Sequence, residues 1–480
     1  MESNRGKQIV SGMMWRFAEK ITAQSVSFIV SIVLARILMP DDYGVVAIVC
    51  VFTAIAEIFV TSGLGTALIQ KKNATQIDFS TVFWCNLALS CIIYAAIFIA
   101  APYIAAFYKL PLLTSVIRVL AIKIPINAFN SIQNAYVSRK MEFKKFFFAT
   151  IIGTVVSAIV GIYMAYNGFG VWALVAQILT NNVIDTIVLF LLIEWKPKLE
   201  FSFQNAKPLF DYGWKILATD LVGTVFNNLN AFIIGKKYSS ADLAYYERGK
   251  KFPDMINNNV GATLSSVLFP AMSLSDGIDD IRRIRRKSLK MMEYVMFPLM
   301  FGMFVVADKM ILLLLTEKWL FAVPFVRISC ISAVVGVLGT TLIQEIKAIG
   351  RSDITLKLEL IKKPIYLAVV LIAMQISVEA MAYSLIIIDL IAFGFNVYPV
   401  RKYIGFDFKL HLGDALSSLW MTGVMCVFMY GVDMVISHDL FAFVAQIVVG
   451  IMIYFILSIV SKNDSYIYLK QEFLSKVRSR

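Results

Sequence analysis

Apolar runs separated by short polar segments recur along the whole 480-residue chain. Each run is about twenty residues long, which is enough to cross a bilayer as a helix. The bilayer core offers no water to the peptide groups, so runs of this length are predicted to be helical. The pattern predicts fourteen membrane spans, at about 10–36, 43–69, 79–101, 113–137, 146–166, 170–194, 209–235, 242–271, 288–307, 321–346, 354–375, 378–400, 412–435 and 440–461.

An internal repeat divides this pattern. Trp15 and Arg16 near the start of the first span correspond to Trp214 and Lys215 near the start of the seventh, and DDYGVVAI (41–48) corresponds to ADLAYYER (241–248). Repeated halves are common in transporters, with the substrate site at the interface between them. We therefore predict an all-α polytopic membrane protein with an N-terminal six-helix lobe (1–200), a C-terminal six-helix lobe (201–405), and an extra helix pair with a cytoplasmic tail (406–480).

Composition and charge support a membrane protein. Hydrophobic residues make up 59% of the chain and charged residues only 16%, whereas about a quarter of an average soluble domain is charged. The net charge of +13 is divided among short loops, which argues against a nucleic-acid partner. About 30 of the 45 basic residues fall in one set of alternate loops and the termini, and about six in the opposite set. This asymmetry predicts that both termini are cytoplasmic.

Candidate catalytic chemistry is sparse. The five cysteines fall inside apolar runs without paired spacing, which favours buried thiols over disulfides or a zinc site. The two histidines, His411 and His438, lie far apart at the edges of spans. We find no nucleophile with a base and no metal-ligand pattern, and the outer loops are short. An enzyme such as a polysaccharide polymerase is therefore disfavoured, and no catalytic residue, metal or cofactor is predicted.

Charged and amide residues instead lie within the predicted spans. Ionisable groups at membrane depth usually face a helix-bundle interior or an aqueous cavity. In DLAYYERGKKFPDMINNNVG (242–261), Glu247, Lys251, Asp254 and Asn258 recur at three- and four-residue steps and so share one helix face. Similar polar positions are Arg16, Lys20 and Gln24 in the first span, and Lys215, Asp220, Asn227 and Asn228 in the seventh.

Several of these residues have a structural alternative. Lys250 can extend to the membrane surface, as long basic side chains near span ends often do. Glu247 and Lys251 can form a structural pair one helical turn apart. Asp220 is either an acid that couples transport to protons or a permanent partner of a cation such as Lys215. The lone acids Glu57, Asp185 and Asp389 are interpreted as groups that hydrogen-bond between helices.

The sequence resembles the bacterial polysaccharide exporters, Wzx-type flippases of the multidrug/oligosaccharidyl-lipid/polysaccharide superfamily. The resemblance lies in LARILMPDDYGVVAI (34–48), SGLGTALIQKK (62–72), APYIAAFYKLP (101–111), NGFGVWALVAQ (167–177), IIGKKYS (233–239) and AYYERGKKFPDMINNNVGATLSSVLFPAMS (244–273). After residue 275 the agreement is mainly in hydropathy. The resemblance implies a flippase in the bacterial inner membrane that moves an undecaprenyl-pyrophosphate-linked oligosaccharide for lipopolysaccharide, capsule or exopolysaccharide synthesis.

The resemblance also suggests a role for the polar residues in the spans. Arginine and lysine can neutralise a pyrophosphate, and amides can hydrogen-bond sugar hydroxyl groups. The predicted substrate-binding residues are Arg16, Lys20, Gln24, Lys215, Asn227, Asn228, Arg248, Lys251 and Asn258, and the predicted ion-coupling residues are Asp220, Asp254 and Glu247. Candidate protein partners are a polysaccharide polymerase and chain-length proteins. The alternative function is a cation-coupled multidrug exporter of the same superfamily, which the basic residues and the two extra spans disfavour.

Overall fold

A computed structural model describes residues 2–71, 73–275 and 277–478, and this part of the chain is helical with no strand. The chain folds into two compact units, residues 1–244 and 245–480. The predicted first lobe ends at residue 200, whereas the first compact unit ends at residue 244. The division into two six-helix lobes and an extra pair stays a prediction. The all-α fold class is confirmed.

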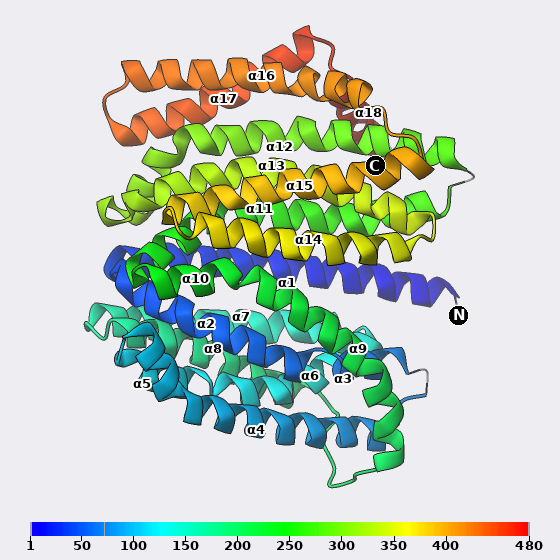
Figure 1. Cartoon of the computed structure of the whole chain (residues 1–480). Coiled ribbons are helices and arrows are strands. Elements are labelled where there is room, and N and C mark those ends of the chain that lie inside the picture. Colours follow the sequence, from blue (N-terminus) through cyan, green and yellow to red (C-terminus); the bar gives the residue numbers. More distant parts are fainter. Residues whose placement is uncertain (1, 72, 276, 479–480) are drawn as a thin grey trace. The chain divides into compact units, whose positions relative to one another are not determined.

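The first unit consists, in its described residues, of ten helices and the start of an eleventh (Figure 1). The helices are α1 (Glu2–Ile37), α2 (Pro40–Thr61), α3 (Leu64–Gln70), α4 (Gln76–Tyr108), α5 (Leu112–Leu120), α6 (Lys123–Lys140), α7 (Phe143–Tyr166), α8 (Val171–Leu192), α9 (Phe203–Asn227) and α10 (Leu229–Lys237). Within this unit α1 packs along α7, α7 packs along α8, and α9 packs on α2 and α3.

The second unit contains most of α11 and the helices that follow it. They are α11 (Ser240–Ser273), α12 (Ile278–Leu315), the short 3-10 helix η1 (Glu317–Ala322), α13 (Val323–Ala348), α14 (Ser352–Ala373), α15 (Val378–Tyr403), α16 (Phe408–Val435), α17 (Asp439–Val460) and α18 (Asp464–Arg478). Figure 1 shows α16 and α17, in orange, as a neighbouring pair beside α12, and both contact α12.

Eleven helical segments in the described part of the chain are long and apolar enough to cross a membrane, or twelve if the bent pair α9 and α10 is one span. The other two predicted spans, 242–271 and 354–375, fall on α11 and α14, whose first halves carry clustered charges. The predicted count of fourteen therefore stays a prediction.

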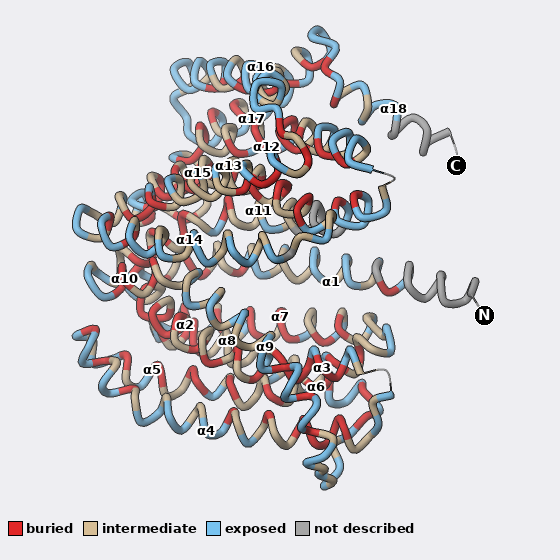
Figure 2. Tube along the Cα trace, turned by 45° about the vertical axis from the view of Figure 1, so that its right-hand side comes forward, coloured by how far each residue is buried: buried red, intermediate tan, exposed pale blue. Residues whose placement is uncertain are grey.

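Large apolar side chains cover much of the outer surface of the helices. In α16 and α17, Val427, Met434, Val435 and Val460 are each more than two-thirds exposed. Figure 2 shows much of α16 in the pale blue of exposed residues. Exposed apolar surface of this extent would be unfavourable in water, since burying apolar area is the main favourable contribution to folding. Hydrocarbon chains of a bilayer remove that cost, so the surface is that of a multi-pass membrane protein.

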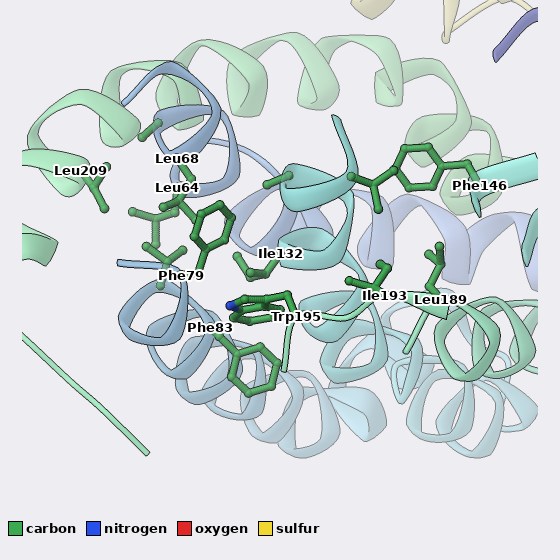
Figure 3. Close-up of a cluster of buried hydrophobic side chains, with 14 of the residues drawn as sticks. Leu64, Leu68, Phe79, Phe83, Ile132, Phe146, Leu189, Ile193, Trp195 and Leu209 are labelled. Atoms are coloured by element: carbon green, nitrogen blue, oxygen red, sulfur yellow. The ribbon is translucent and has the colours of Figure 1, made fainter. Parts of the chain in front are cut away.

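The segment after α8 is fixed to the start of α4. Trp195 is buried against the rings of Phe79 and Phe83, at 5.8 and 6.2 Å between centroids (Figure 3). The Trp84 Nε1 group donates to the Lys198 carbonyl at 2.8 Å. The connection between the two sequence repeats therefore has a defined path along the first unit.

The helix α9 approaches α3 through two glycines. A Cβ atom at Gly63 would lie 2.6 Å from the Gly213 carbonyl oxygen, which is closer than real Cβ contacts. Gly63 also has a φ of +89°, a conformation that a side chain would strain. Leu209 on α9 completes the hydrophobic cluster that includes Leu64 and Leu68 of α3 (Figure 3). Glycine at both positions thus allows close backbone packing that brings α9 into the first unit.

Candidate functional site

The predicted internal repeat has a structural counterpart at two helix starts. At the start of α2, the Met39 backbone N–H donates to Asp42 Oδ2 at 3.1 Å. At the start of α11, the Ser239 backbone N–H donates to Asp242 Oδ2, also at 3.1 Å. Each aspartate caps its helix by accepting from a peptide group that has no partner within the helix. The two copies therefore share a turn as well as a sequence pattern.

These two turns also contact each other. Ser240 Oγ donates to Asp41 Oδ1 at 2.6 Å. A Cβ atom at Gly44 would lie 1.9 Å from the Ser240 carbonyl oxygen, so α2 meets the start of α11 directly through its backbone. Corresponding parts of the repeat thus meet within the first unit.

The predicted residues on α1 lie on a surface that is largely exposed in this conformation. Arg16 is exposed; its Nη1 is 2.6 Å from Glu19 Oε2, and its guanidinium lies 4.8 Å from the Phe146 ring centroid on α7. Lys20 is exposed and Gln24 is half-buried. The Arg16 side chain is 53% exposed, and so an anion can approach its guanidinium.

The predicted residues on α9 lie between its middle and the bend that follows it. Lys215, Asp220 and Asn227 are exposed, and the axes of α9 and α10 differ by 41°. Asn228 lies at the break, and its Nδ2 donates to the Thr224 carbonyl at 2.9 Å. The Asn228 backbone N–H donates to the same carbonyl at 3.0 Å, so Thr224 accepts two hydrogen bonds from the residue at the break.

The predicted residues on α11 separate into buried and exposed groups. Arg248 is 5% exposed, and its guanidinium lies 5.2 Å from the ring of Trp319, which is fully buried. Lys251 and Asn258 are exposed. Of the nine predicted substrate-binding residues only Arg248 is buried, and its contact with Trp319 also anchors η1 to α11.

Glu247 and Asp254 belong to a charged cluster with Lys250 of the same helix. Lys250 interacts electrostatically with both acids and with Tyr246, whose ring centroid lies 5.0 Å from the Lys250 Nζ atom. Lys250 is half-buried, and its interpretation as a side chain that extends to the membrane surface stays a prediction. The basic neighbour that acts on Glu247 is Lys250, whereas Lys251 of the predicted pair is exposed.

Two lone acids hydrogen-bond between helices, as predicted. Glu57 Oε1 on α2 accepts from Asn127 Nδ2 on α6 at 2.7 Å and lies 3.2 Å from Lys123 Nζ. Asp389 on α15 accepts from the Ser332 hydroxyl on α13. A carboxylate that is held in this way positions neighbouring helices, because leaving it unpaired inside the protein would be costly.

Other ionisable groups in the spans also have partners or neighbours within their own unit. Arg118 Nε donates to the Phe98 carbonyl at 3.3 Å, and Arg327 Nη2 lies 2.6 Å from Asp308 Oδ2. Asp185 lies against α7, and its buried Oδ1 has no hydrogen-bond partner in the described part of the chain. Its predicted hydrogen bond between helices stays a prediction.

Metal binding finds no support in the part of the chain that the structure describes. No group of three or more His, Cys, Asp or Glu side chains there could hold a metal ion, and the five cysteines are free thiols. The predicted residues on α1 and α9 belong to the first unit and those beyond 244 to the second. Their joint lining of one cavity stays a prediction.

Solved structures with the same fold are transporters. The inward closed conformation of the lipid II flippase MurJ matches with a TM-score of 0.78 at 13% identity, covering 94% of this chain and 99% of that one. An inward-facing multidrug resistance MATE family transporter of the MOP superfamily matches with a TM-score of 0.63 at 15% identity, covering 80% of this chain and 94% of that one. At such low identity the likeness shows the fold.

Curated relatives are similar in sequence over most of their length. Teichuronic acid biosynthesis protein TuaB of Bacillus subtilis (strain 168) is 23% identical over 90% of both chains. Succinoglycan biosynthesis transport protein ExoT of Rhizobium meliloti (strain 1021) is 23% identical over 72% of this chain and 71% of its own. Lipopolysaccharide biosynthesis protein WzxC of Escherichia coli (strain K12) is 21% identical over 77% of this chain and 76% of its own.

Residues 33–324 match the family described as polysaccharide biosynthesis protein. This range includes the contacting turns of the repeat and the charged cluster of α11. The chain is therefore a multi-pass membrane protein that belongs to the polysaccharide biosynthesis protein family.

Proposed function

We propose that this protein is a flippase that moves an undecaprenyl-pyrophosphate-linked oligosaccharide across the bacterial cytoplasmic membrane by alternating access. The observation that carries the proposal is the family match over residues 33–324, which is more than half of the chain. The relatives are named for the synthesis or transport of three different polysaccharides, so the shared element is the handling of such material and not one sugar. The fold, shared with a lipid II flippase, supports the same conclusion.

The exposed polar residues provide suitable chemistry for such a substrate. Arg16, Lys20, Lys215 and Lys251 supply positive charge, and Asn258 supplies both a donor and an acceptor. A pyrophosphate needs compensating cations when it leaves bulk water, because a bare charge in an apolar medium is strongly unfavourable. We infer that these residues bind the pyrophosphate and sugars, and that no catalytic step is involved.

A multidrug exporter is the second candidate, favoured by the MATE match. The flippase match covers more of this chain, 94% against 80%. Exposed lysines and arginines within spans also suit an anionic substrate better than a cationic drug. We therefore rank the flippase first.

We further propose that both termini face the cytoplasm, on the loop-charge asymmetry. The side of the membrane that holds the charged loops is then the side on which the lipid-linked substrate is made. A polysaccharide polymerase and chain-length proteins are the proposed partners on the opposite side, where the product emerges.

Charge reversal tests the proposed substrate site. Arg16→Glu and Lys251→Glu should each lower glycan export about tenfold or more, since losing one charged partner at a binding site costs about 2 kcal/mol or more. The measurement is surface glycan in cells whose export depends on this protein, normalised to its amount in the membrane. Lys198→Glu, the same change at an exposed residue in the segment after α8, is the matched control and should export normally. Normal export by both Arg16→Glu and Lys251→Glu would contradict the proposal that Arg16 and Lys251 bind the pyrophosphate.

Asp220 is the residue through which we propose that transport is coupled to protons. It is exposed on α9 and forms no ion pair in the described part of the chain, so a permanent partner is not evident in this conformation. Asp220→Asn should abolish the dependence of transport on the pH gradient while substrate binding is retained. Transport in vesicles with and without an imposed gradient measures this. Unchanged dependence in the variant would show that Asp220 does not carry the proton.

A further inference from the structure

A cavity of about 780 Å³ lies in the second unit, apart from the residues assigned to the substrate. Its walls come from the first turns of α12, the end of α15, the start of α16 and the start of α18. Arginine and lysine side chains dominate one side, and Leu289, Phe406 and Leu410 supply apolar surface. This volume falls in the range of small-molecule binding sites.

The cavity lies where spans meet the membrane surface. The charged turns of α12 end at Lys290, and an apolar run follows from Met291 with one acid, Glu293, before Asp308. On the same side, α17 ends at Val460 and α18 begins at Asp464. Side chains at this depth face lipid headgroups, which carry phosphate.

Ion pairs hold the walls of the cavity together. Arg286 binds Asp414 of α16 through two nitrogens, at 2.6 and 2.9 Å. Lys290 Nζ lies 3.1 Å from Asp414 Oδ1 and 3.1 Å from Asp464 Oδ2, and so it joins α12 to both α16 and α18. These pairs shape the cavity, and their cations are largely neutralised by their partners.

Two cations of the lining are not used in this way. Lys287 Nζ lies 3.6 Å from the Tyr468 ring centroid of α18. Arg401 is exposed at the end of α15 and makes no ion pair within the residues that the structure describes. Both are available to a ligand in the cavity.

The charged groups in and around the cavity favour a ligand that carries a single negative charge. Seven lysines and arginines line it, with three aspartates, and three further carboxylates pair with lining arginines from outside it: Asp279, Asp280 and Glu345. Beneath the lining, His411 Nε2 lies 3.6 Å from the fully buried Glu293, and this pair is neutral if it shares one proton. The excess is thus one positive charge. A phosphodiester, with one negative charge, balances it, whereas a pyrophosphate brings more.

We propose that this cavity binds the phosphodiester headgroup of an anionic phospholipid of the surrounding leaflet, and that Lys287 and Arg401 contact the phosphate. The glycerol and the first acyl carbons would lie on the apolar wall. A bound headgroup would join α15 to α18, which the protein's own ion pairs do not connect in the described part of the chain.

Binding of phosphatidylglycerol to the purified full-length protein tests the proposal. The measurement is the dissociation constant for short-chain phosphatidylglycerol in detergent, with phosphatidylcholine as the zwitterionic comparison. The double variant Lys287→Gln, Arg401→Gln should bind phosphatidylglycerol about 25-fold more weakly, at about fivefold per cation near a membrane surface. The matched control is Lys409→Gln. Lys409 lies at the start of α16, near the cavity but outside its lining, so this variant should bind as the wild type does.

Two results would overturn the proposal. One is equal binding of phosphatidylglycerol by the wild type and the double variant, or equal binding of phosphatidylcholine and phosphatidylglycerol by the wild type. The other is displacement of phosphatidylglycerol by an equimolar amount of undecaprenyl pyrophosphate, which would assign the cavity to the transported lipid. If the double variant does not fold, the two single variants, each expected to bind about fivefold more weakly, decide the question.

Discussion

Replacing Arg285 by methionine is expected to lower the free energy of unfolding by about 3–5 kcal/mol, the usual cost of removing one partner of a buried ion pair. Arg285 Nη1 on α12 lies 2.9 Å from Glu345 Oε2 on α13, and Glu345 is fully buried. Arg285 Nη2 also donates to the Gly405 carbonyl at 3.0 Å. Without the guanidinium, the carboxylate and that carbonyl both lose a partner inside the protein.

The double variant Arg285→Met, Glu345→Leu distinguishes an uncompensated charge from lost packing. Removing both charges should restore most of the stability, because well-packed apolar residues often replace a buried pair without loss. Reversible unfolding in detergent, followed by tryptophan fluorescence, measures both variants. The interpretation fails if the double variant is as unstable as Arg285→Met, or if the single variant is as stable as the wild type.

Gly44→Ala is expected to have the second large effect, a loss of about 3 kcal/mol or more, at the upper end of the cost of overpacking. The added methyl group would lie 1.9 Å from the Ser240 carbonyl oxygen and 2.4 Å from its carbon, and neither belongs to a flexible side chain. The turns before α2 and α11 would have to separate, which would break the hydrogen bond between Ser240 and Asp41. Glycan export should fall together with the stability of the variant.

Gly223→Ala is the control for this change. It lies within α9, and a Cβ atom there meets nothing within 4 Å. Alanine is favoured over glycine inside a helix by about 1 kcal/mol, so this variant should be as stable as the wild type or more so. Thermal unfolding and surface glycan are measured for both variants. Equal stability of Gly44→Ala and the wild type would mean that the close approach is not needed.

The hydrophobic pattern predicted the helices well because each span must satisfy its peptide groups by itself. The repeat was also visible in the sequence, since Asp42 and Asp242 occupy the same place in two capped turns. The roles of Glu57 and Asp389 followed from the cost of an unpaired acid in an apolar setting. These predictions needed no knowledge of which helices are neighbours.

Partners from distant segments could not be predicted in this way. The stacking of Arg248 on Trp319 depends on the packing of η1 against α11. The cavity at the start of α12 joins residues from four helices, and only the run of arginines was conspicuous in the sequence.

The contact between Gly63 and Gly213 bears on how such a chain could arise from a duplicated ancestor. The sequence repeat begins again near residue 214, yet α9 is part of the first unit, and Leu209 lies in that unit's hydrophobic cluster. A fragment that ends near residue 200 would leave Leu64 and Leu68 without this cover. The first copy thus packs against the opening helix of the second, so a cut where the duplication joined them would expose part of the first unit's core.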